Sequence, residues 1–119
     1  MINKELQQEI INWHKSVFAD AEIESQLLKW QEEYRELEQA DDYATFLDEY
    51  ADCIIVSTSF LRYGEIGETL NFVFMKFLES EKNSWNIDKE EIEEAVERKL
   101  KINKQRNWFK NSQRIYKHK

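Results

Sequence analysis

Two groups of acidic residues in this sequence have a spacing that suits the binding of a cation. The first is Glu32, Glu33 and Glu36, in the segment QEEYREL, and the second is Glu49 and Asp52, in DEYADCII. Residues three apart in an α-helix lie within about 60° of each other around its axis. The second and third acids of the first group therefore share one helix face, as do the two acids of the second group.

The second acidic group lies among apolar residues. Glu49 shares its expected helix face with apolar side chains, and Asp52 directly precedes the run CIIV. Burying an unpaired carboxylate is costly, and carboxylates that lie close together also repel one another. A divalent cation relieves both problems, and oxygen ligands of this kind favour Mg²⁺, with Mn²⁺ as the alternative. Zinc is disfavoured because the sequence holds one cysteine and two histidines far apart.

The alternative interpretation of the acidic pattern is an ordinary charged helix surface. Asp and Glu together account for 24 of the 119 residues. Five acidic positions at fixed offsets therefore arise readily by chance once all starts and spacings are counted. Taken alone, the acidic pattern favours a solvated face over a metal site.

The last expected helix carries a stripe that changes from apolar to polar along its length. It begins after Asp88, a typical N-cap residue, and its apolar face continues into Lys99, Asn103 and Arg106 at steps of four and three. Lys and Arg neutralise phosphate oxygens, and Asn both donates and accepts hydrogen bonds. This stripe suits a pocket for an anionic phosphate ligand, although basic residues also complement the dipole at the end of a helix.

The elements that must position these residues are helices. Apolar residues at helical spacing predict segments at about 4–19, 22–39, 42–63, 66–82 and 88–107. Only Asp41 and Asp42 separate the second segment from the third, which predicts an antiparallel hairpin with Glu33 and Glu49 at similar heights. The predicted fold is an all-α bundle of four to five helices around this hairpin. Segment 66–82 is more apolar than one buried face requires, which indicates contact with another subunit.

The composition defines the broad class of protein. The sequence has 119 residues, no proline and two glycines, which predicts a single domain over 1–119 with almost no β-hairpin turn chemistry. Its formal charge of -7 disfavours a nucleic-acid partner. The single cysteine favours the reducing cytoplasm, and no apolar run has the length of a membrane span. The basic tail at about 110–119 is expected to fray.

Taken together, the acidic groups and the later basic element resemble the MazG-like, all-α nucleoside triphosphate pyrophosphohydrolase superfamily. That pattern is EExxE, a spacer, ExxD and a later KxxxNxxR on the last helix. The sequence matches it with Glu32–Glu36, twelve intervening residues, Glu49–Asp52 and then Lys99–Arg106. The resemblance covers roughly 23–62 and 88–108, and it leaves 64–86 unmatched.

The resemblance implies a role for each matched residue. The expected Mg²⁺ ligands are Glu33, Glu36, Glu49 and Asp52. Glu32 resembles an acid that supports the ligands or binds a second metal, or the group that positions the attacking water, and Glu32 and Glu33 are the expected catalytic residues. The expected phosphate and nucleotide contacts are Lys99, Asn103 and Arg106. The implied reaction is hydrolysis of a (deoxy)nucleoside triphosphate between its α- and β-phosphates, giving monophosphate and pyrophosphate. The implied setting is nucleotide-pool house-cleaning by a homodimer or homotetramer.

Recognition of the base is assigned to aromatic residues. Trp13 and His14, with Phe18 and Trp30, are candidates for stacking on a base or reading its edge. Ordinary core packing is the favoured alternative for the three larger aromatic residues, and the sequence gives His14 no partner. The alternative to an enzyme is a non-enzymatic, oligomeric interaction or regulatory protein. It would bind no metal, and its acidic residues would be solvated.

Overall fold

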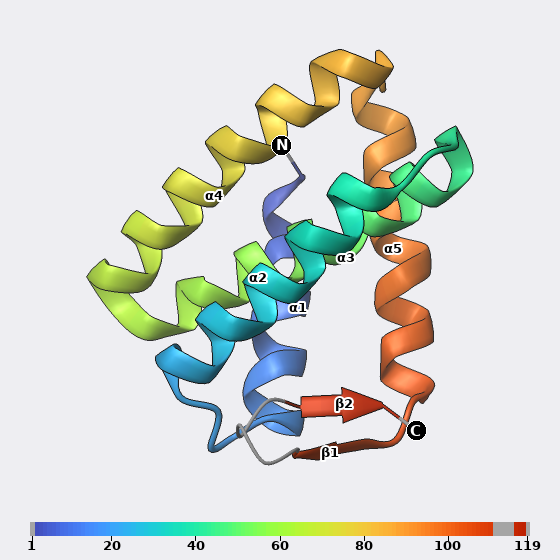
Figure 1. Ribbon diagram of the computed structural model, residues 1–119. Helices are drawn as coiled ribbons and strands as arrows, with labels where there is room; N and C mark the ends of the chain where they lie inside the picture. The colour runs from blue at the N-terminus through green and yellow to red at the C-terminus, as the bar shows by residue number, and fades with distance from the viewer. Residues whose placement is uncertain (1, 111–115, 119) are drawn as a thin grey trace.

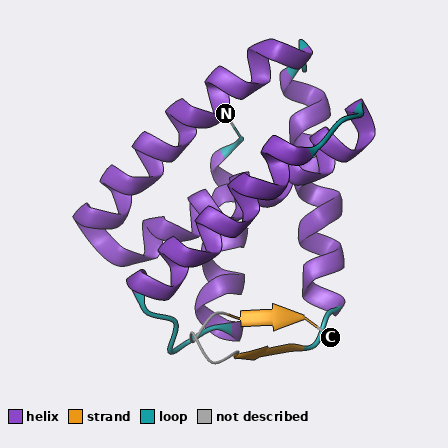
Figure 2. Cartoon of the chain, in the orientation of Figure 1, coloured by secondary structure: helices purple, strands orange, loops and turns teal. Residues whose placement is uncertain are grey.

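Helices account for nearly all of the secondary structure, which confirms the all-α prediction (Figures 1 and 2). The computed structural model describes residues 2–110 and 116–118. The elements in these ranges are α1 (Lys4–Val17), α2 (Ile23–Gln39), α3 (Tyr43–Ser59), the short 3₁₀ helix η1 (Phe60–Tyr63), α4 (Gly64–Trp85), α5 (Lys89–Gln105), and the strands β1 (Trp108–Lys110) and β2 (Tyr116–His118). No helix of the described residues combines the length and apolar character that a bilayer crossing requires.

The core is built around α3, which packs against α1, α2, α4 and α5 (Figure 1). Every residue from Cys53 to Ser59 is buried, and Phe46, Tyr50 and Ile54 are at most 2% exposed. A helix that is apolar on all sides is stable only when other elements surround it. The run CIIV therefore places α3 at the centre, so Asp52, which directly precedes that run, lies close to the core, whereas Asp48 on the same helix pairs with Arg98 at the surface.

Two aspartates fix the starts of the helices that carry the site. Asp42 Oδ1 accepts a hydrogen bond of 2.8 Å from the backbone N–H of Thr45 at the start of α3. Asp88 Oδ1 accepts one of 3.0 Å from the N–H of Glu91 at the start of α5, which confirms the predicted N-cap. The connection between α2 and α3 spans only 40–42, and the two helices lie side by side beyond it (Figure 1).

The third predicted helix is broken near its end. The segment expected to be helical to 63 ends as α-helix at Ser59 and continues as η1, and α4 begins at Gly64. Gly64 has a φ of +71°, in the left-handed region that favours glycine. A side chain on Gly67 would meet the carbonyl oxygen of Phe60 at 1.8 Å. The two glycines therefore permit a close turn between α3 and α4 that helical periodicity does not reveal.

The C-terminal segment contains the two short strands β1 and β2. Trp108 pairs with His118 and Lys110 with Tyr116 in an antiparallel ladder, while 111–115 lie outside the described residues. The indole Nε1 of Trp108 donates a hydrogen bond of 3.1 Å to the backbone oxygen of Asn103. Its ring also packs edge-on against Phe18, with ring centroids 5.1 Å apart. These contacts anchor β1 on the end of α1, and the basic composition of the tail gave no sign of them.

Candidate functional site

A cavity of about 310 Å³ is lined by residues from α1, α2, α3, α5 and the start of β1. All ten site residues predicted from the sequence line it: Trp13, His14, Glu32, Glu33, Glu36, Glu49, Asp52, Lys99, Asn103 and Arg106. They come from four helices and the residue that follows α5, and they span more than 90 positions of the sequence. The structure thus brings the predicted residues to one place, and their chemical roles stay predictions.

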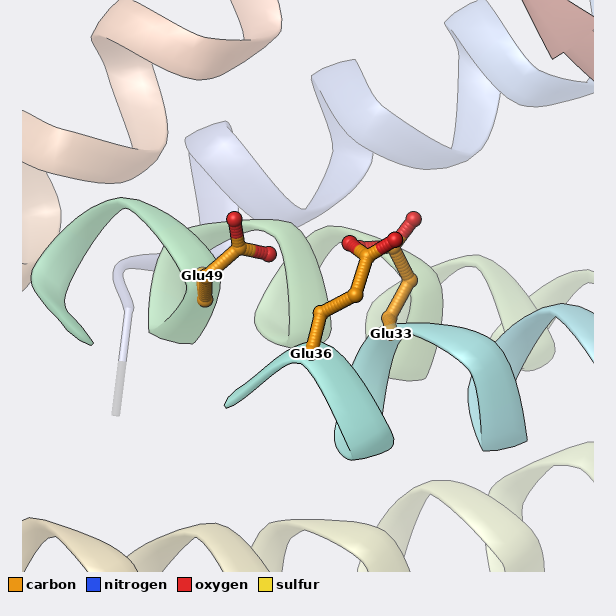
Figure 3. Close-up of side chains that lie close together, drawn as sticks. All are labelled: Glu33, Glu36 and Glu49. Carbon is orange, nitrogen blue, oxygen red and sulfur yellow. The ribbon is translucent and has the colours of Figure 1, made fainter. Parts of the chain in front are cut away.

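Three carboxylates converge at the junction of α2 and α3. Glu33 and Glu36 from α2 and Glu49 from α3 each provide one oxygen, and the three oxygens lie within 4.8 Å of one another. Figure 3 shows the side chains of the α2 pair reaching toward the carboxylate on α3. Burial differs within this carboxylate cluster, because Glu33 is buried, Glu49 is half-buried and Glu36 is exposed. The cluster therefore extends from the buried Glu33 to the solvent-exposed Glu36.

Two oxygens of the carboxylate cluster are buried without a hydrogen-bond partner. They are Oε2 of Glu33 and Oε2 of Glu49. A buried acceptor that has lost water and gained no donor costs roughly 1–3 kcal/mol, and more when it is charged. Two of the three converging carboxylates thus each keep one buried oxygen without a partner, and hard oxygen ligands of this kind fit a cation such as Mg²⁺ or Mn²⁺. This observation, which is independent of the acidic spacing, distinguishes the cluster from a solvated charged face.

Asp52 lies in the same cavity but outside the group of three. Its Oδ2 is 3.3 Å from the ammonium of Lys99 on α5. A second lysine, Lys29 on α2, has its Nζ 3.2 Å from Oε1 of Glu33. The sequence analysis missed Lys29 because a Lys–Glu pair four apart is common on helix surfaces. One lysine therefore pairs with a member of the carboxylate cluster, and the other pairs with the neighbouring Asp52.

Burial shifts the protonation of these carboxyl groups. Burial raises the pKa of Glu33 to about 7, and the nearby Lys29 ammonium opposes this shift. Burial also raises the pKa of Glu49 to about 7, with the Asp52 and Glu36 carboxylates adding to the effect. The pKa of Asp52 is raised by burial as well, against the opposing charge of Lys99. In the metal-free protein, protons can thus partly take the place of a cation at the cluster.

These shifts make the stability of the metal-free protein depend on pH through Glu33. Its folded-state pKa lies above the unfolded value, so its contribution to stability is present at low pH and is lost as pH rises through about 7. With a chelator present, we therefore compare the free energies of unfolding of Glu33→Gln and the wild type. The value for the variant minus that for the wild type should increase by about 2 kcal/mol as pH rises from 5 to 8. Urea denaturation of both proteins across this range measures the difference.

The difference in the free energy of unfolding between the wild type and Glu33→Gln does not contain the pH-dependent contribution of His14. Burial lowers the pKa of His14 to about 3, so His14 adds stability as pH rises toward its unfolded value. That contribution is common to the wild type and Glu33→Gln, and it cancels in their difference. A difference that stays constant from pH 5 to 8 would show that Glu33 has an ordinary pKa.

The part of the cavity away from the carboxylates is lined by uncharged side chains. A chain of hydrogen bonds orders them, and it starts from Arg62, which lies outside the lining. Arg62 Nη1 is 2.9 Å from Nδ1 of His14. Since an arginine side chain only donates, Nδ1 must accept, and the ring proton is on Nε2. His14 is also hydrogen-bonded to the side chain of Gln26. Gln26 Nε2 donates to Ser59 Oγ at 2.6 Å, and Ser59 Oγ donates to the oxygen of Val56 at 2.6 Å. The chain of donors fixes the tautomer of the histidine and the orientation of the amide.

Aromatic rings form the wall next to this hydrogen-bonded chain. Trp13 packs edge-on against Phe18 with centroids 5.3 Å apart, and Trp108 lies 6.3 Å from Trp13. Trp30, the other aromatic candidate for base contact, does not line the cavity. It stacks on Phe74 at 4.2 Å in the core, so for this residue the packing interpretation is correct.

Gln26 lies seven residues before Glu33 on α2, which separates the two ends of the cavity by about 10 Å along the helix axis.

Comparisons with protein-family models, with curated proteins and with solved structures gave no significant match to this chain. They therefore do not bear on the resemblance to the MazG-like superfamily. A function is therefore inferred from the cavity alone, in which carboxylates, basic side chains and an aromatic wall lie in separate parts.

Proposed function

We propose that this protein is a Mg²⁺-dependent hydrolase that cleaves nucleoside triphosphates between the α- and β-phosphates, giving monophosphate and pyrophosphate. The observation that carries the proposal is the arrangement of one cavity. It has a carboxylate cluster with partnerless buried oxygens, basic side chains from α5 beside the cluster, and an uncharged aromatic and amide wall about 10 Å away along α2. These three environments suit, in order, a cation, a phosphate chain and a base.

The cation would be held by Glu33, Glu36 and Glu49, with Asp52 beside them. The two partnerless oxygens and the all-oxygen donor set support this assignment. When bound, Mg²⁺ supplies charge neutralisation at phosphate oxygens and lowers the pKa of coordinated water. Glu32 also lines the cavity, and in this proposal its carboxylate accepts a hydrogen bond from the attacking water and orients it.

The phosphate chain would contact the polar end of α5. Lys99 and Arg106 provide positive charge on the wall that faces the carboxylates. Arg106 Nη1 donates to Oδ1 of Asn103 at 3.1 Å. Because this bond occupies the amide oxygen, the amide N–H groups of Asn103 are directed to other acceptors, and a substrate oxygen is a suitable one. The three residues thus offer donors only, as an anionic substrate requires.

The proposal is tested by release of pyrophosphate from a panel of canonical and modified nucleoside and deoxynucleoside triphosphates. Each nucleotide is incubated with Mg²⁺, with Mn²⁺ or with EDTA. We expect release from at least one nucleotide with either metal and none with EDTA. A folded, metal-supplemented protein that turns over no nucleotide would contradict the proposal.

The alternative function, an oligomeric interaction protein without activity, has one observation in its favour. α4 exposes large apolar side chains: Ile66 (62%), Phe72 (64%), Val73 (41%) and Phe77 (50%). This exposure agrees with the expectation that segment 66–82 contacts another subunit, and a homo-oligomer is part of both hypotheses. The two hypotheses differ at the carboxylate cluster, because only the hydrolase requires a cation there.

A further inference from the structure

Lys29 is the basic residue of the cavity for which the motif resemblance gives no role. Its side chain is 19% exposed, and that of its partner Glu33 is 11% exposed. The pair of Lys99 and Asp52 is similarly enclosed, with side chains 13% and 17% exposed. All four side chains line the same cavity. These are therefore largely desolvated ion pairs that face a binding cavity, unlike the solvated pairs of a helix surface.

The pair of Lys29 and Glu33 leaves the carboxylate only half satisfied. The ammonium is near Oε1, while Oε2 is buried without a partner. A largely buried ion pair stabilises a protein little unless its remaining polar atoms are also satisfied. Lys29 is therefore a partial counter-charge for Glu33, and a divalent cation, which carries twice the charge, can compete with it for the carboxylate.

The net charge of the cavity lining indicates what Lys29 could contribute to ligand binding. The lining contains five carboxylates and three basic side chains, so it carries excess negative charge when these groups are ionised. A triphosphate is repelled from such a surface. A divalent cation at the cluster would cancel the excess and would also draw on the Glu33 carboxylate that Lys29 partly neutralises. The same binding event would thus remove the repulsion and weaken the hold of Glu33 on the ammonium group.

We propose that Lys29 exchanges partners during binding. A divalent cation displaces its ammonium from Glu33, and Lys29 then donates hydrogen bonds to an oxygen of the phosphate chain beside the cation. This inference depends on the proposed function, which supplies the phosphate ligand. It makes Lys29 a substrate-positioning residue and makes cation and phosphate binding cooperative, because each favours the state in which the lysine has left the carboxylate.

The exchange predicts opposite effects on two binding constants when Lys29 is replaced by methionine, which has a similar length and no charge. Mn²⁺ alone should bind more tightly to Lys29→Met, because its competitor for Glu33 is gone. Inorganic pyrophosphate, measured with saturating Mg²⁺, should bind about tenfold more weakly, because one charge-assisted hydrogen bond is lost. Electron paramagnetic resonance of Mn²⁺ and calorimetry of pyrophosphate binding give the two constants on the full chain.

Two further variants make the result specific. Lys29→Arg keeps the charge and should largely restore pyrophosphate binding, and it also guards against a folding defect in the methionine variant. Lys15→Met removes an exposed lysine on α1 outside the cavity and should change neither constant. Loss of both affinities in Lys29→Met, or no change in either, would overturn the exchange.

Neither measurement involves turnover, so this inference and the proposed function can fail separately. Opposite shifts in the two affinities, together with no pyrophosphate release from any nucleotide, would support the exchange and contradict the hydrolase. Hydrolysis by the wild type with parallel losses of both affinities in Lys29→Met would support the hydrolase and contradict the exchange. A wild type that binds no Mn²⁺ would overturn both.

Discussion

Glu49→Gln is expected to lower Mg²⁺-dependent pyrophosphate release by about 10³-fold or more. The substitution keeps the size of the side chain but removes the charge of one of the three converging carboxylates. Oε2 of Glu49 is also one of the two buried oxygens that have no partner within the protein. A bound metal contributes several kcal/mol to stabilising developing charge, and each 1.4 kcal/mol is about tenfold in rate. Initial rates of pyrophosphate release at saturating Mg²⁺ give the ratio.

A matched variant on α2, the helix that packs against α3, separates the loss of a ligand from a general change of charge. Glu38 lies on α2, is exposed and does not line the cavity. Glu38→Gln removes the same charge, and its rate should stay close to that of the wild type. If Glu49→Gln retains the activity of Glu38→Gln, the carboxylate cluster is not the centre of the reaction.

Arg62→Met is expected to lower the free energy of unfolding by about 3 kcal/mol. The guanidinium is hydrogen-bonded to Nδ1 of His14 at 2.9 Å, and it donates to the backbone oxygens of Phe18 at 2.9 Å and Ala19 at 3.1 Å. Those carbonyls follow the end of α1, where unsatisfied oxygens and the helix dipole both favour a cation. Chemical denaturation of the wild type and the variant at pH 7 measures the loss.

The geometry of Arg62 also predicts how its conservative variant behaves. Lysine has the charge but lacks the planar fork that reaches several acceptors at once, so Arg62→Lys should recover only part of the lost stability. Arg35→Met removes an exposed arginine on α2 and should change the free energy of unfolding by less than about 0.5 kcal/mol. A cost for Arg62→Met as small as that for Arg35→Met would show that the arginine does not hold the end of α1.

The helices were predictable because they depend on spacing within single segments, whereas the acidic spacing alone favoured a solvated face and indicated a metal site only together with the basic element of the last helix. The run CIIV required a buried α3, and the three-residue steps from Glu33 to Glu36 and from Glu49 to Asp52 placed acids beside the apolar faces. The short connection at 40–42 then left the two helices few ways to pack other than on each other. The N-cap at Asp88 is equally local, and it was found from its residue type and position alone.

The remaining features depend on contacts between residues that are distant in the sequence. Arg62 and His14 are 48 positions apart, and nothing near His14 in the sequence indicates a partner. Lys29 has the spacing of a common surface pair, and its burial results from the packing of α2 on α3. Trp108 lies in a basic segment with little sign of order, and it becomes fixed through aromatic contacts with α1. Tertiary packing, which local patterns do not encode, decided each of these cases.

The claim on which both proposals depend is that Glu33, Glu36 and Glu49 bind a divalent cation. Titration of Mn²⁺ into chelator-treated wild type and Glu49→Gln, followed by electron paramagnetic resonance, tests it without any assumption about the substrate. We expect saturable binding to the wild type, competition by Mg²⁺, and a large loss of affinity in Glu49→Gln. Binding that is absent from the wild type, or equal in the two proteins, would contradict the account.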